Sequence, residues 1–168
     1  MTKAVRILGI DPGSRVTGYG IVELTGALTR PVAWGAIPTD GEHSDRLRQI
    51  YFEIGAIVAE HAPDEIAIER VFVHRNVDSA LKLGQARAAA LCATFGRQMP
   101  IHEYAPREIK QALAGSGSAD KAQVEYMVKV LLGLRDRMTS DAADALAVAV
   151  CHIHTRVARR VLARLGTA

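Results

Sequence analysis

RILGIDPGSRVTGYGIVEL, residues 6–24, contains two short apolar runs separated by a turn. The first run is rich in β-branched residues, and the Pro-Gly pair that follows Asp11 is typical of a turn. The second run resumes at Gly18, so the stretch predicts a β-hairpin. Asp11 stands where the first predicted strand ends, and an unpaired charge in a buried position is strongly destabilising. Asp11 therefore requires a partner, which could be a side chain, a backbone turn or a metal ion.

The remainder of the chain alternates between strand and helix patterns. Apolar residues recur at helical spacing between Ser44 and His61, and Pro63 closes that segment. Further strands are expected at 31–39, 65–70 and 100–105. One further helix is expected from Asp78 or Ser79 to about Gln98, and another begins at Pro106. The last two are expected from 119 to 132, after a Ser118 cap, and from Thr139 or Ser140 onward. The order predicts an α/β fold with a five-stranded mixed sheet flanked by helices.

Length and composition narrow the class of protein. The 168 residues are expected to form a single domain, 1–168, with a basic tail from about residue 155 that reads as a solvated helix end. A net charge of +3 allows a nucleic-acid partner without requiring one. The N-terminal apolar run is too short for a signal peptide, and no run approaches the roughly 18 apolar residues of a membrane span. We expect a soluble, cytoplasmic protein without a membrane partner.

Four acidic residues stand at the ends of predicted buried elements. Asp11 and Glu69 each end an apolar strand, while Asp141 and Asp144 open the last helix, three residues apart and on one face. If the strand that ends at Glu69 runs parallel to the first strand, Asp11 and Glu69 lie at the same edge of the sheet. Four carboxylates converging there would resist ionisation unless a cation joined them.

The donor set favours a particular class of ion. Carboxylate oxygens suit Mg²⁺, with Mn²⁺ as a plausible substitute, and two such ions in one site are a recurring arrangement for phosphodiester hydrolysis. Two of the acids have a simpler interpretation. Asp11 could be a turn former, and Asp141 could interact with the helix dipole. Glu69 inside an apolar strand and Asp144 before ALAVAV are harder to explain in that way.

Four motifs carry a resemblance to a known family. LGIDPGSRVTGYGIV, AIERVF, DSALKLGQARAAA and SDAADALAVAV match, in order and spacing, the RuvC-type Holliday-junction resolvases of bacteria, over residues 6–154. The resemblance implies a ribonuclease-H-like fold, a homodimer and paired symmetric nicks in four-way junction DNA in the presence of Mg²⁺, in recombination and repair. It places the family's four catalytic, metal-binding acids on Asp11, Glu69, Asp141 and Asp144. It also implies partnership with the branch-migration helicase complex of RuvA and RuvB.

The resemblance extends to residues that would contact DNA. Lys110 and Lys121 match lysines that the family uses near the catalytic centre, although lysines beside loops are often merely solvated. Phe72 matches a base-stacking aromatic, with core packing as the alternative. Further candidates for phosphate contacts are Arg75, Asn76, Lys82 and Arg87, and also Arg15 in the first turn. The many small residues between Asp78 and Gln98 would serve either internal packing or the dimer interface.

Two rival functions and a possible zinc site remain to be weighed. An ATPase of the actin and sugar-kinase kind also carries Asp-x-Gly in its first hairpin, but it needs a duplicated second domain. A non-catalytic four-way-junction-binding protein of the same fold is the other rival, and retention of all four acids argues against it. The six histidines, among them His102, His152 and His154, show no zinc-site spacing, so no zinc site is expected.

Overall fold

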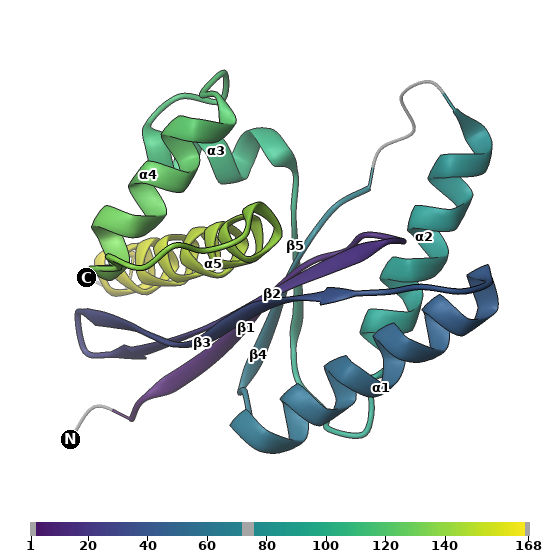
Figure 1. The fold of residues 1–168 in the computed structure, drawn as a ribbon. Helices are drawn as coiled ribbons and strands as arrows, with labels where there is room; N and C mark the ends of the chain where they lie inside the picture. Colours follow the sequence, from purple (N-terminus) through teal and green to yellow (C-terminus); the bar gives the residue numbers. More distant parts are fainter. Residues whose placement is uncertain (1–2, 72–75, 167–168) are drawn as a thin grey trace.

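The computed structural model describes residues 3–71 and 76–166, and in these ranges the chain forms five strands and five helices (Figure 1). The strands are β1 (Val5–Asp11), β2 (Val16–Thr25), β3 (Leu28–Pro38), β4 (Glu65–Glu69) and β5 (Ile101–Tyr104). The helices are α1 (His43–His61), α2 (Val77–Cys92), α3 (Pro106–Ala114), α4 (Lys121–Leu132) and α5 (Ser140–Leu165).

The strands form one mixed sheet in the order β3-β2-β1-β4-β5. The hairpin strands β1, β2 and β3 pair antiparallel, whereas β4 pairs parallel with both β1 and β5. Parallel pairing requires a crossover, and α1 and α2 supply the two crossovers. The predicted five-stranded mixed sheet is confirmed, and the condition that β4 runs parallel to β1 is met.

Alternation along the strands divides the core into two layers. Ile7 of β1 and Ala67 of β4 face α3, α4 and α5, while Ile10 and Ile68 face α1 and α2. Figure 1 shows the two groups of helices on opposite sides of the sheet. Because side chains alternate at period two, Asp11 and Glu69 fall on the same face as Ile7 and Ala67, which is the face that α5 covers.

Glycines on this face allow α5 to approach the sheet closely. A Cβ added at Gly18 would lie 2.0 Å from the carbonyl oxygen of Asp141, and one at Gly9 would lie 2.1 Å from that of Ala145. A side chain at either position would therefore push the helix away. Since Gly18 pairs with Asp11 across the sheet, the contact brings the start of α5 next to the end of β1.

Two predicted helix starts differ from the structure. Asn76 caps α2, because its side chain accepts a hydrogen bond from the Ser79 backbone N–H, and the helix ends at Cys92 well before Gln98. Asp120, which forms a capping box with Gln123, caps α4 in place of Ser118. In both cases several cap-forming residues are adjacent in sequence, and the backbone geometry selects one of them.

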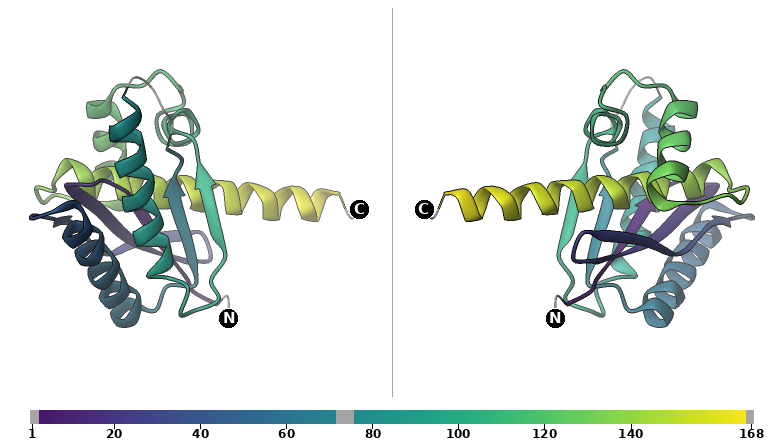
Figure 2. Two further views of the ribbon diagram at one scale, coloured as in Figure 1. Left: turned by 90° about the vertical axis from the view of Figure 1, so that its right-hand side faces the viewer. Right: turned by 90° about the vertical axis from the view of Figure 1, so that its left-hand side faces the viewer.

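The last helix is longer than the part that the sheet covers. Thr139 caps α5, as expected, and residues 145–153 are buried throughout. The basic tail from about residue 155 continues the same helix, and Figure 2 shows its last turns extending away from the rest of the fold. Over the ranges 3–71 and 76–166, no helix combines the length and apolarity needed to cross a membrane.

Candidate active site

The four acids meet at the carboxyl ends of β1 and β4. Ile10 pairs with Ile68, so the next residues, Asp11 and Glu69, end neighbouring parallel strands. The first turns of α5 bring Asp141 and Asp144 over the same edge, because the carbonyl of Asp141 lies against Gly18. The convergence expected from the sequence therefore arises from the parallel pairing of two strands and the glycine contact of one helix.

The pKa of Asp11 reflects both its burial and the charges of the other three acids. Burial raises the pKa of Asp11 to about 7, and the negative charges of Asp144, Glu69 and Asp141 contribute to the increase. Burial also raises the pKa of Glu69, again with a contribution from Asp144. Asp11 thus needs a nearby positive charge to be fully ionised near neutral pH, and such a charge would also favour ionisation of Glu69.

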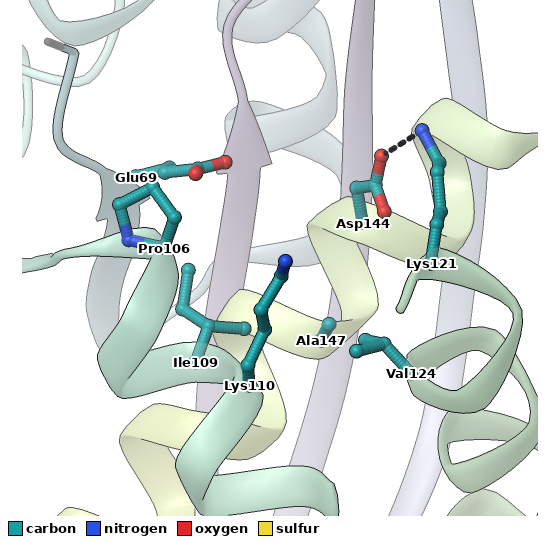
Figure 3. Close-up of a pocket in the computed structure, with 8 residues that line it drawn as sticks. All are labelled: Glu69, Pro106, Ile109, Lys110, Lys121, Val124, Asp144 and Ala147. Carbon is teal, nitrogen blue, oxygen red and sulfur yellow. Dashed lines mark ion pairs between the residues drawn. The ribbon is translucent and has the colours of Figure 1, made fainter. Parts of the chain in front are cut away.

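Two lysines supply part of that charge. Lys121 forms an ion pair with Asp144, with 2.7 Å between Nζ and Oδ2, and this hydrogen bond raises the pKa of Lys121. Figure 3 shows this pair on one side of a pocket and Glu69 on the other, with Lys110 rising from α3 toward the space between them. Lys110 and Lys121 both lower the pKa of Glu69, which opposes the larger effect of burial.

The pocket continues past Glu69 toward Asp11. One hollow is lined by Glu69, Asp144 and the two lysines, and a second is lined by Asp11 and Glu69. Both hollows include Pro106, the first residue of α3, which the sequence singled out only as a helix start. Three of the acids and both lysines therefore line two adjoining hollows that share Glu69 and Pro106, whereas Asp141 lines neither.

The acids fit a hard divalent cation. Asp11 and Glu69 are carboxylates whose ionisation is opposed by burial and by neighbouring negative charge, and oxygen donors of this kind suit Mg²⁺ or Mn²⁺. In the described part of the chain, Glu65, His102 and His152 form the one group with three ligand atoms within 4.8 Å of one another, so the four acids are more widely spaced.

The other predicted DNA contacts have varied surroundings. Phe72 and Arg75 lie outside the described residues. Asn76 caps α2, and Lys82 pairs with Asp78 at the surface, beside the hollow that Arg15 also lines. These positions leave the proposed contacts with phosphate as predictions.

Arg87 was expected to contact phosphate, but its side chain is half-buried and already bound to other residues of the chain. Its guanidinium pairs with Glu103 at 2.9 Å and donates to the Glu69 carbonyl oxygen at 3.4 Å. These interactions connect α2 to the ends of β4 and β5. In this structure Arg87 supports the strand end that carries Glu69, and its contact with DNA stays a prediction.

Sequence spacing did not reveal two features of the site. The glycines at 18 and 20 were assigned only to a strand, although glycine at alternate positions of one strand is a signal of close packing on one face. The group of Glu65, His102 and His152 was also missed, because its members come from three different elements and have no metal-site spacing along the chain.

The raised pKa of Asp11 predicts how stability depends on pH. From 3.8 upward the unfolded chain releases this proton, whereas the folded protein retains it to about pH 7, so the free energy of unfolding falls as pH rises between these values. Each pKa unit corresponds to about 1.4 kcal/mol, so the decrease without divalent metal should reach a few kcal/mol. Urea unfolding at several pH values, with Asp11→Asn as comparison, measures it. An equal pH dependence in both proteins would contradict this assignment.

Comparison with known proteins identifies the family. Residues 7–152 match the family described as "Crossover junction endodeoxyribonuclease RuvC". The RuvC of Methylococcus capsulatus is 57% identical over 152 residues, which are 90% of this chain and 92% of the relative. The RuvC of Halorhodospira halophila is 56% identical over 163 residues, which are 96% of this chain and 97% of the relative. The structure of T. thermophilus RuvC in complex with Holliday junction substrate superposes with a TM-score of 0.84 at 34% identity, covering 98% of both chains. This chain therefore belongs to the RuvC family of crossover junction endodeoxyribonucleases.

Proposed function

We propose that the chain is a Mg²⁺-dependent endonuclease that resolves Holliday junctions by paired symmetric nicks, in DNA recombination and repair. The observation that carries the proposal is the electrostatic coupling of Asp11 to Glu69, Asp141 and Asp144 at one edge of the sheet, in a member of the RuvC family. The T. thermophilus RuvC structure contains a Holliday junction and matches nearly the whole of this chain, which supports the choice of substrate.

The acids would hold the metal and the lysines would hold the DNA. Asp11, Glu69, Asp141 and Asp144 would supply the oxygen ligands for two Mg²⁺ ions per site, whose chemistry there would be to activate the attacking water and to stabilise the leaving oxygen. Lys110 and Lys121 bring ammonium groups to the same pocket, where a phosphate of the DNA backbone would bind them. Lys121 would then exchange its contact with Asp144 for one with the phosphate.

Further parts of the proposal concern assembly. A homodimer with two-fold symmetry would present two identical sites to the two strands of a symmetric junction, which explains paired nicking. The small residues of α2 suit such an interface. We also propose one nuclease domain over 1–168, a cytoplasmic location, and action together with a branch-migration complex of RuvA and RuvB.

The direct test is cleavage of a synthetic four-way junction, beside a linear duplex of the same sequence. With Mg²⁺ we expect symmetric nicks in the junction alone, and none after chelation of the metal. Tight binding to the junction without cutting would support a non-catalytic junction-binding protein. Equal cleavage of junction and duplex would contradict the proposed selectivity.

Lys121 provides a narrower prediction. Lys121→Gln should lower the rate of junction cleavage about 100-fold or more, because it removes a preorganised cation from the reacting phosphate. The affinity for the junction should change little, since many other contacts contribute. Single-turnover cleavage and gel-shift binding measure the two effects separately.

Lys129→Gln is the matched control for Lys121. Lys129 lies on the same helix and pairs with Glu125 at 2.7 Å, away from the residues that line the pocket. We expect cleavage at the unmodified rate in this variant. A comparable loss of cleavage in both variants would show that general charge, and not position, explains the effect of Lys121.

A further inference from the structure

A second cluster of metal-ligand side chains lies at the opposite end of β4 from Glu69. Glu65 begins β4, His102 lies on the neighbouring strand β5, and His152 is buried on α5. The Nε2 atom of His152 is 2.6 Å from Oε2 of Glu65, and the Nε2 atom of His102 is 3.7 Å from the same oxygen. The rings of the two histidines are stacked, with 4.1 Å between their centroids.

The groups around the cluster hold its ligand atoms in place. The Tyr104 hydroxyl is 2.6 Å from Nδ1 of His152, and Arg156 binds Oε1 of Glu65, which leaves Oε2 directed at the histidines. In protein metal sites, a ligating histidine generally makes a hydrogen bond through its other ring nitrogen, and a ligating carboxylate through its other oxygen. Both of these supporting interactions are already present here.

We propose that Glu65, His102 and His152 bind a transition-metal ion, with Zn²⁺ as the best match, in a site separate from the four acids. Two imidazoles and one carboxylate are a known donor set for zinc, with water at the fourth position, and imidazole favours zinc over Mg²⁺. With bonds of about 2.0–2.1 Å, tetrahedral ligand atoms lie about 3.3 Å apart, and the two observed distances lie on either side of that spacing.

The charges in this region are compatible with a divalent ion. Arg156 lies on the far side of the Glu65 carboxylate, so one oxygen faces each cation. His102 lines a hollow together with two acids, Glu103 and Glu108, and two arginines, Arg70 and Arg159, so acidic and basic side chains are balanced there.

The position of the cluster indicates a structural role. Glu69 lies four residues along β4 from Glu65, and Asp144 lies eight residues along α5 from His152, so the two sites are about 12–13 Å apart. An ion bound to the cluster would link α5 to β4 and β5 without entering the pocket of the acids. We therefore expect it to stabilise the helix that carries Asp141 and Asp144, and to be independent of the proposed nuclease reaction.

The test is metal binding to the full chain after removal of bound metals, in an excess of Mg²⁺ that occupies the four acids. Zn²⁺ near 100 times its dissociation constant should raise Tm by about 5–10 °C. Co²⁺ used as a spectroscopic probe should give the visible absorption of a four-coordinate ion, with one ion per chain. These measurements need no DNA, so they give the same answer whether or not the chain cuts junctions.

Two matched variants separate a metal site from a network of hydrogen bonds. His102→Phe removes one ligand but keeps a ring stacked on His152, and it should weaken Zn²⁺ binding by at least about 100-fold. His154→Phe makes the same change at an exposed histidine of α5 and should bind Zn²⁺ normally. Absence of a Zn²⁺-dependent rise in Tm, or an equal rise in His102→Phe, would overturn the proposal and leave a hydrogen-bonded cluster only.

Discussion

Asp11→Asn is expected to abolish junction cleavage while leaving junction binding intact. Asp11 is the acid whose pKa all three other carboxylates raise, so it lies where their charges converge. An amide oxygen at this position is a much weaker ligand for a divalent cation, and it cannot neutralise the cation's charge. We expect the cleavage rate to fall at least about 1,000-fold, which corresponds to roughly 4 kcal/mol of transition-state stabilisation.

The measurement compares cleavage and binding of one synthetic junction by the two proteins. Asp136→Asn, at an exposed position in the loop before α5, is the matched control and should cut at the normal rate. Because Asp11 is held at a raised pKa, Asp11→Asn should also unfold at higher urea concentration than the unmodified protein near pH 7 without metal. Retained cleavage in Asp11→Asn would remove this residue from the catalytic group.

Gly18→Ala is expected to impair both stability and cleavage, although the substitution adds a single methyl group. The added carbon would lie 2.0 Å from the carbonyl oxygen of Asp141, an atom of the α5 backbone that cannot rotate away. Overpacking of this kind destabilises proteins by about 1–3 kcal/mol. The helix must move away from β2 to relieve the contact, which displaces Asp141 and Asp144 relative to Asp11.

The loss of cleavage should be larger than the loss of stability suggests. A displacement of about 1 Å in a catalytic group can lower a rate about 100-fold. Gly55→Ala is the matched control: a Cβ at Gly55 in α1 meets no atom within 4 Å, and alanine in a helix is favoured by about 1 kcal/mol. Urea unfolding and single-turnover cleavage of both variants measure the contrast. Normal cleavage by Gly18→Ala would show that the site tolerates movement of α5.

The strands could be predicted from the sequence because their signals are local. The apolar, β-branched run that predicts β1 lies within six residues, and the turn after Asp11 follows from Pro-Gly. Helix starts were less well determined where cap-forming residues cluster, as at Asn76 and Asp120. There the choice depends on how the preceding segment approaches the helix, which the sequence pattern does not contain.

In the candidate site too, local sequence signals could be used for prediction, whereas contacts between distant segments could not. The acids could be proposed because each ends an apolar element, and the parallel-strand rule placed Asp11 beside Glu69. The ion pairs of Lys121 with Asp144 and of Arg87 with Glu103 could not be foreseen, because both depend on how side chains of separate elements meet. The sequence motifs were enough to predict the residues of the candidate site, whereas their ion-pair partners depend on tertiary packing.

The sequence alone was sufficient to identify the sheet, the four acids and the family resemblance, since periodicity, turn residues and motif order are all properties of the chain. Tertiary structure was needed for two contacts between distant segments: Gly18 against the backbone of Asp141, and Glu65 against His152. Alternate glycines indicate a close approach on one face of β2, but no local signal identifies the partner residue in either contact. Each exists because glycines at the centre of the sheet let α5 pack at backbone distance, and that packing fixes what the helix brings to both ends of β4.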